Sequence, residues 1–111
     1  MPYIRISLMQ AKRGHADDVA RIMEHLLAFY RGQPGYIDWY LLRSADDIGD
    51  IGRVTIWRTV ADADATAQTP HVLSERSELP PLIDEESHVE RSFEAATPSA
   101  AASRSPRATS S

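Results

Sequence analysis

The spacing of apolar residues switches between a period of two and a period near 3.6, and this alternation limits the folds open to the chain. Residues 3–12 alternate, with Ile4, Ile6 and Leu8 on one face, which predicts a strand. The next apolar residues recur at the spacing of a single helical stripe. That stripe consists of Val19, Ile22, Met23, Leu26, Leu27 and Tyr30.

The middle of the chain predicts a hairpin. Residues 36–43 and 53–59 are rich in β-forming side chains, and the polar, glycine-bearing segment 44–52 separates them. We therefore expect two antiparallel strands here.

Two short helical segments and a last strand follow. Thr59 and Asp62 have the spacing of a capping box, which opens a short helix. Thr69, with a proline after it, opens a second helical segment that Pro80-Pro81 ends. Residues 87–95 alternate again and predict the last strand.

This order of elements, βαββαβ, predicts an α+β protein with a ferredoxin-like antiparallel sheet and helices on one face. The two middle strands carry large apolar residues on both faces, as Trp39 and Tyr40 illustrate. A sheet that helices cover on one side should have a polar outer face. The apolar outer face therefore predicts a homodimer joined through the sheet face, as a dimeric α+β barrel.

Length and composition limit the number of domains and the class of partner. The 111 residues suffice for one domain, over 1–95, and the Ala-, Ser- and Pro-rich segment 96–111 predicts a disordered tail. The net charge of −4 argues against a nucleic-acid surface, and the absence of cysteine excludes disulfides and thiolate sites. No apolar run is long enough to cross a membrane, and we expect a cytoplasmic protein.

Four short motifs in order carry a resemblance to a known family. They are PGY at 34–36, VTIWRTVADADA at 54–65, TPH at 69–71 and LPPLI at 79–83. In this order and spacing the chain resembles the antibiotic biosynthesis monooxygenase (ABM) domain family of dimeric α+β barrels, over roughly residues 3–95.

The resemblance implies a cofactor-independent oxidation by O2 of a small aromatic, quinol or polyketide-type substrate, with neither metal nor flavin. If the deprotonated substrate supplies the electron, the protein needs only an apolar pocket, a few hydrogen-bonding groups and a base. A non-catalytic dimeric barrel that binds a small hydrophobic ligand is the alternative. An isomerase-like or dehydratase-like reaction is a third.

The resemblance also suggests site residues. Trp57 matches the tryptophan that ends a strand at the substrate cavity of the family's oxygenases, although it could serve packing alone. At two positions where the quinone-forming members carry other polar residues, this chain has Arg53 and Ala63. Haem degradation is excluded, because this chain has Ser7, Thr66 and Arg76 at the positions that correspond to the functional residues of the haem-degrading members.

His71 matches a histidine of the family's Thr-Pro-His segment. Its place at a helix start favours a neutral imidazole that could act as a base, and a packing role is the other interpretation. Trp57 and His71 are thus the candidate catalytic pair. No two of the four histidines have metal-ligand spacing, so no metal site is expected.

Residues on one face of neighbouring strands are expected to form the cavity wall opposite the first helix. Small side chains among large ones would leave room for a ligand, and Arg53 could hold a phenolate or carboxylate. The candidate substrate-binding residues are Ser7, Tyr40, Arg53, Thr55 and Met23, and Met9, Ile22 and Leu26 complete the expected wall.

Overall fold

The computed structural model describes residues 1–45 and 49–96. The predicted hairpin loop falls in part on residues 46–48, and the predicted tail falls almost entirely on residues 97–111. Both of these segments lie outside the described residues. The elements are β1 (Tyr3–Ala11), α1 (Ala16–Tyr30), β2 (Tyr36–Arg43), β3 (Asp50–Trp57), α2 (Val60–Ala67), α3 (Pro70–Arg76), a 3-10 turn η1 (Pro80–Leu82) and β4 (Ile83–Glu94).

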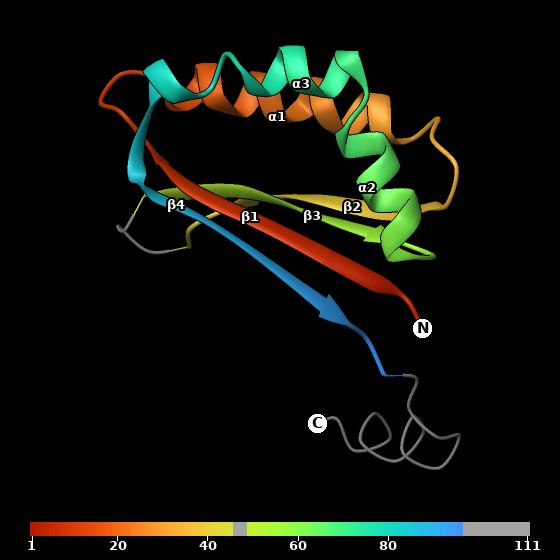
Figure 1. Ribbon diagram of the computed structural model, residues 1–111. Coiled ribbons are helices and arrows are strands. Elements are labelled where there is room, and N and C mark those ends of the chain that lie inside the picture. Colours follow the sequence, from red (N-terminus) through yellow and green to blue (C-terminus); the bar gives the residue numbers. More distant parts are fainter. Residues whose placement is uncertain (46–48, 97–111) are drawn as a thin grey trace, which may run out of the picture.

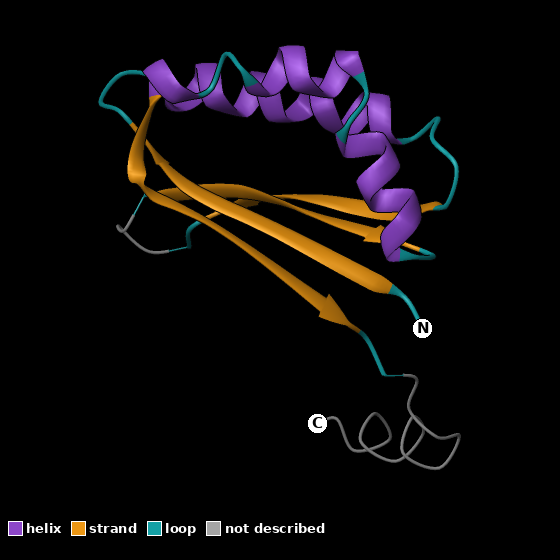
Figure 2. Ribbon diagram, viewed as in Figure 1, coloured by secondary structure: helices purple, strands orange, loops and turns teal. Residues whose placement is uncertain are grey.

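The four strands form one antiparallel sheet in the order β2-β3-β1-β4. Figures 1 and 2 show α1, α2 and α3 on the same side of this sheet, so none of the described helices covers the other face. The predicted α+β, ferredoxin-like βαββαβ fold is confirmed. Within the described residues, no helix has the length and apolar character needed to span a bilayer.

The apolar stripe of α1 forms most of the core. All six predicted stripe residues are buried, and Ala20 joins them. Asp18 lies in the first turn, where its carboxylate accepts hydrogen bonds from His15 (3.0 Å) and Arg21 (2.8 Å). These two contacts, that with His15 foremost, lower the pKa of Asp18.

Hydroxyl caps begin both short helices, as predicted. The Thr59 Oγ1 accepts the backbone N–H of Asp62 at 3.1 Å, and the Thr69 Oγ1 accepts that of Val72 at 3.4 Å. However, α3 ends at Arg76, four residues before Pro80, which instead opens η1.

Two strands begin earlier than predicted. β3 starts at Asp50 rather than at residue 53, and β4 starts at Ile83 rather than at residue 87. The reason is pairing with β1, whose Gln10 and Ala11 register with these strands near their starts. Cross-strand hydrogen bonds therefore extend both strands into sequence that has no β pattern of its own.

The predicted location of Tyr40 is wrong. Tyr40 registers with Val54, is 54% exposed and lies on the helix-free face, whereas Trp39 registers with Thr55 on the helix side. An irregularity between Tyr36 and Asp38 shifts the register, so Tyr36 and Trp39 share a face despite their odd spacing.

The helix-free face carries apolar side chains on all four strands, with Arg91 and Asp38 among them. Its rows include Ile4 with Phe93, Ile6 with Val54 and Tyr40, and Leu8 with Val89. Phe93 and Val89 are 43% and 46% exposed. We name this surface, made of Ile4, Ile6, Leu8, Tyr40, Val54, Val89 and Phe93, the open face.

Candidate functional site

Polar side chains cross the sheet in one row on the helix side. Ser7 of β1 registers with Arg53 of β3 on one side and with Glu90 of β4 on the other. The next row pairs Arg5 with Thr55. Registered residues of antiparallel strands share a face, so these polar groups gather beneath the helices.

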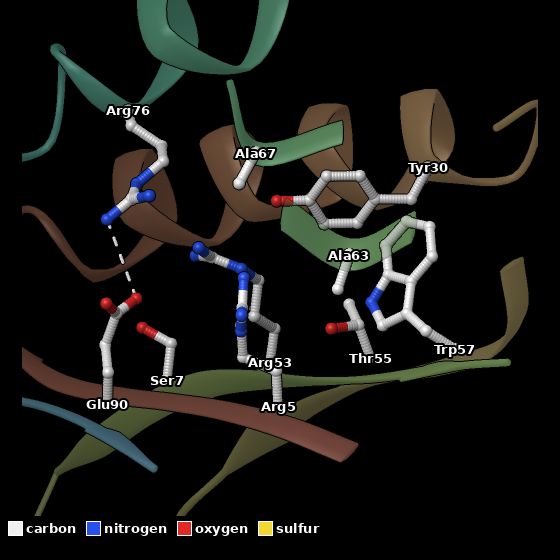
Figure 3. Close-up of a pocket in the computed structure, with 10 residues that line it drawn as sticks. All are labelled: Arg5, Ser7, Tyr30, Arg53, Thr55, Trp57, Ala63, Ala67, Arg76 and Glu90. Carbon is white, nitrogen blue, oxygen red and sulfur yellow. Dashed lines mark ion pairs between the residues drawn. The ribbon is translucent and has the colours of Figure 1, made fainter. Parts of the chain in front are cut away.

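These rows form the floor of a small cavity, with Tyr30, Ala63 and Ala67 above it and Trp57 closing one end (Figure 3). Its volume is about 40 Å³. A water molecule needs roughly 10–15 Å³, so the closed cavity has room for a few waters or for one polar group of a ligand.

Arg53 is the most unusual side chain of the cavity. Only 6% of it is exposed, and within residues 1–45 and 49–96 its buried Nη1 has no hydrogen-bond partner. Burial lowers the pKa of the Arg53 guanidinium, and Arg76 adds to that effect, whereas Tyr30 and Glu90 favour the charged form. A buried cation with a free donor is suited to bind an anionic oxygen.

Trp57 is 2% exposed and packs edge-on against Tyr30, with ring centroids 5.6 Å apart, and against Tyr36 at 6.2 Å. Figure 3 shows its indole nitrogen directed toward the cavity. The ring is therefore part of the core, and its single N–H donor faces the space that a ligand would occupy.

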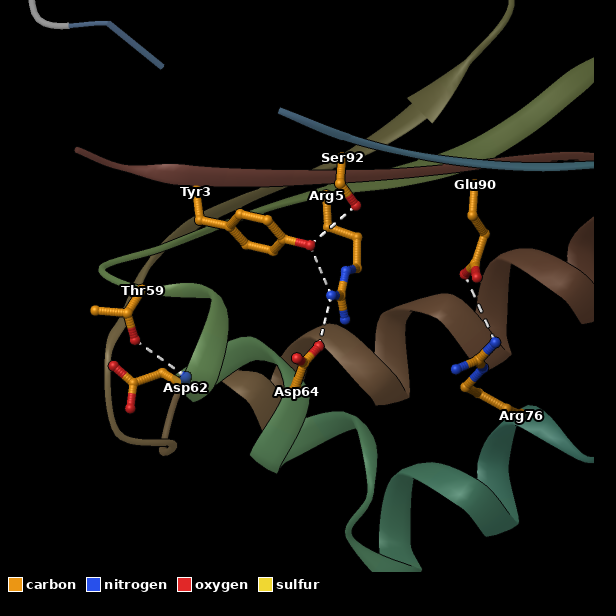
Figure 4. Close-up of polar contacts among 8 residues, drawn as sticks. All are labelled: Tyr3, Arg5, Thr59, Asp62, Asp64, Arg76, Glu90 and Ser92. Carbon is orange, nitrogen blue, oxygen red and sulfur yellow. Dashed lines mark hydrogen bonds and ion pairs between the residues drawn. The ribbon is translucent and has the colours of Figure 1, made fainter. Parts of the chain in front are cut away.

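A polar network holds α2 against the sheet beside the cavity (Figure 4). The Arg5 Nη2 donates to the Tyr3 hydroxyl at 2.7 Å and to the Asp64 Oδ1 at 2.8 Å, and the Tyr3 hydroxyl donates to the Ser92 Oγ at 3.0 Å. Burial lowers the pKa of Arg5, but its hydrogen bonds with Asp64 and Tyr3 outweigh this and raise it. Arg5 thus has a carboxylate partner within hydrogen-bonding distance, whereas the Nη1 of Arg53 has no hydrogen-bond partner among the described residues.

Side chains of α3 and β4 line the opposite end of the cavity. Arg76 of α3 pairs with Glu90 at 3.6 Å (Figure 4), and the two are 34% and 42% exposed. Beside them, the Nε2 of His88 lies 3.1 Å from the Ser7 Oγ and 3.9 Å from the Glu90 Oε2. Arg76 and His88 also line a groove on the outside, between α3 and β4.

The structure does not bring His71 and Trp57 together. His71 is exposed and stacks on Phe29, with ring centroids 4.1 Å apart, and it lines a shallow surface groove near the His25–Glu75 pair. None of these residues lines the cavity.

Met23 is fully buried in the core and does not line the cavity either. Three other candidates, Ser7, Arg53 and Thr55, do line it together with Trp57. In the described part of the chain, no group of three or more His, Asp or Glu side chains is arranged to hold a metal ion.

The sequence itself can be assigned to a known family. The sequence matches the family described as antibiotic biosynthesis monooxygenase over residues 2–74, more than half of the chain. The chain belongs to the antibiotic biosynthesis monooxygenase family. No curated protein is significantly similar to it in sequence.

Solved structures share the ABM fold with this chain. SnoaB from Streptomyces nogalater, a cofactor-independent oxygenase, is 18% identical with a TM-score of 0.75 over 87% of this chain and 95% of that one. Rv0793 from Mycobacterium tuberculosis is 16% identical with a TM-score of 0.79 over 90% and 100%. PA3566 from Pseudomonas aeruginosa is 21% identical with a TM-score of 0.74 over 86% and 95%. At these identities the likeness shows the fold alone.

Several cavity residues of this ABM chain were not among the predicted site residues. Tyr30 was interpreted as core and Arg76 only as a departure from the haem-degrading members, while Arg5 and Glu90 had no role. His88, which lies beside the cavity, had no role either. The alternation of the last strand puts His88 and Glu90 on one face, and this pattern could have identified them as candidate site residues.

Proposed function

We propose that this chain is a cofactor-independent monooxygenase that oxidises a small aromatic, quinol or polyketide-type substrate with O2 in the cavity beneath α1 and α2. One observation carries the proposal: Arg53 is buried in this cavity with an Nη1 that lacks a hydrogen-bond partner among the described residues. Membership of the ABM family supplies the reaction class.

The chemistry requires a substrate oxygen that becomes negative before O2 accepts an electron. A fixed cation in a site that excludes water stabilises such an oxyanion far more than water does, and no reorganisation is needed when the charge develops. Arg53 would contact the oxyanion, and Ser7, Thr55 and the Trp57 N–H would complete its contacts. His71 lines a different groove, so we do not assign it the role of base.

The size of the cavity limits how the substrate can bind. Small-molecule sites usually enclose about 300–1,000 Å³, whereas the closed cavity holds about 40 Å³. An exposed ion pair such as Arg76–Glu90 adds only about 0–1 kcal/mol, so its side chains can separate at little cost. The substrate would then place its oxygen beside Arg53 and its apolar body in the outer groove beside Leu73 and Leu79.

Oxygen uptake tests this function. The full chain, freed of metal with a chelator, is incubated with hydroquinones and anthrones while dissolved O2 is recorded. Arg53→Lys and Trp57→Phe should both lower the rate roughly 10- to 100-fold, as loss of a transition-state contact does. His71→Ala is the matched control and should keep the parent rate. Variants of Arg53 and Trp57 that fold and oxidise an accepted substrate at the parent rate would refute the assignment.

The alternative is a non-catalytic dimeric barrel that binds a small hydrophobic ligand. Its dimeric part is supported by the open face, whose exposed apolar side chains a second copy would cover. We propose this homodimer for either function. Ligand binding without any oxygen uptake across the panel would favour the alternative.

A further inference from the structure

The proposed reaction needs a group that takes the substrate proton, and the cavity has a path for it. Ser7 is 2% exposed and lines the cavity in the same row as Arg53. Its Oγ lies 3.1 Å from the Nε2 of His88. The side chain of His88 is 30% exposed, so this pair joins the closed cavity to the outside.

The surroundings of His88 are suited to a proton that arrives from the cavity. The carboxylate of Glu90 lies 3.9 Å from the Nε2, and Arg76 of α3 pairs with that carboxylate from the other side at 3.6 Å. Glu85 of β4 lines the same outer groove. The Nε2 of His88 thus lies between the Ser7 hydroxyl on the cavity side and the Glu90 carboxylate beside it.

We propose that His88, acting through the hydroxyl of Ser7, accepts the proton of a weakly acidic hydroxyl group, phenolic or enolic, whose oxygen binds beside Arg53. This inference rests on the proposed function, because it assigns the proton transfer of that same site.

The proton moves in two linked transfers. The O–H bond of the ligand breaks and its proton bonds to the Ser7 Oγ, while the proton of Ser7 passes to the Nε2 of a His88 that carries its own proton on Nδ1. The ligand keeps the electron pair as an oxyanion paired with Arg53, and His88 becomes an imidazolium. No electron leaves the ligand in this step, and the imidazolium can then release its proton to water through the outer groove.

The other histidines do not offer this path. His71 stacks on Phe29, His25 pairs with Glu75 at 3.4 Å, and His15 pairs with Asp18 at the start of α1. None of the three lines the cavity.

Binding of 4-nitrophenol without oxygen tests the inference, because its phenolate absorbs visible light and no turnover is needed. The full chain carries 15N-labelled histidine, so NMR reports the protonation of each ring. In the parent, the bound probe should be phenolate and the His88 ring should become imidazolium on binding. The rings of His25 and His71 should keep their signals.

Two variants separate this role from a structural one. His88→Gln can still hydrogen-bond with Ser7 but cannot take the proton, and Ser7→Ala removes the bridge. In each, the ratio of bound phenolate to bound phenol should fall roughly tenfold, which corresponds to one pKa unit. His71→Gln should match the parent. If Ser7→Ala does not fold, the partly exposed His88→Gln decides.

Three results would overturn the inference: a His88 ring that stays neutral beside bound phenolate, a His88→Gln variant with the parent ratio, or a parent that does not bind the probe. None of them depends on oxygen uptake, so the proposed function stands or falls separately.

Discussion

At the scale of single residues, two arginines of the cavity have opposite surroundings. Arg5 donates to Tyr3 and Asp64 and is partly exposed, whereas Arg53 is 6% exposed with an Nη1 that has no partner in the described part of the chain. A buried charge without full compensation destabilises the fold. These surroundings are therefore those of a residue that serves ligand binding rather than the stability of the fold.

Replacing each arginine by methionine should separate these roles. Arg53→Met removes a poorly compensated buried charge and should leave the free energy of unfolding unchanged or raise it by about 1 kcal/mol or more. Arg5→Met breaks two hydrogen bonds of a charged group and should lower it by about 1–2 kcal/mol. Urea unfolding measures both values. A large loss in Arg53→Met would mean that the protein itself compensates the charge.

At the scale of elements, the turn before β2 packs closely against the first turn of α2. Gly35 has a φ of +80°, and a Cβ at this position would lie 2.1 Å from the Asp62 Oδ2 and 2.6 Å from the Asp62 Cβ. The Gly35 carbonyl also accepts the N–H of Arg58 at 2.8 Å. The close approach of this turn to the first turn of α2 therefore requires glycine.

Gly14 offers a matched comparison, because its φ is +85° but, apart from its chain neighbours, no atom of the described residues lies within 4 Å of a Cβ there. Gly14→Ala should lower the free energy of unfolding by about 1 kcal/mol, the cost of the left-handed backbone alone. Gly35→Ala should lower it by about 1–3 kcal/mol more, since overpacking adds to that cost. Thermal unfolding compares the two, and equal losses would show that Asp62 moves aside freely.

At the scale of the whole molecule, the open face is the surface through which we propose that two copies associate. Tyr40, which is 54% exposed, lies on this face, whereas Leu73, which is 49% exposed, lies on α3 at the other side of the sheet. Both side chains are exposed in the single chain, so neither should be needed for its folding.

Tyr40→Glu should therefore convert the proposed dimer to a folded monomer, because it puts a charge into an interface made mostly of apolar side chains. Leu73→Glu is the control and should stay dimeric. Light scattering at micromolar concentration gives the mass of each. A monomeric parent, or a dimeric Tyr40→Glu variant, would refute the sheet-face dimer.

The C-terminal segment provides the second prediction at this scale. Residues 96–111 contain no aromatic or large aliphatic side chain. They therefore have no apolar surface with which to dock. Deleting them should leave both the melting temperature and the mass of the assembly unchanged. Calorimetry and light scattering check this, and a fall of several degrees would show that the segment contributes to the fold.

Local sequence patterns were enough to predict the elements and the fold. The stripe from Val19 to Tyr30, the caps Thr59 and Thr69 and the alternation of the strands act over a few residues, so the sequence alone carries them. Ser7, Arg53, Thr55 and Trp57 were predicted for the same wall because equal parity along neighbouring strands puts side chains on one face.

Pairing between distant strands decided the rest. An irregularity near Asp38 puts Tyr40 on the open face, and parity along the chain does not reveal such a shift. Glu90 and His88 reach Ser7 only because β4 pairs with β1, and this long-range register has no local signal in the sequence. Sequence by itself therefore determined the elements and the part of the cavity wall that β1 and β3 supply as Ser7, Arg53, Thr55 and Trp57, whereas the tertiary structure decided the rest of the wall and which histidine lies beside it.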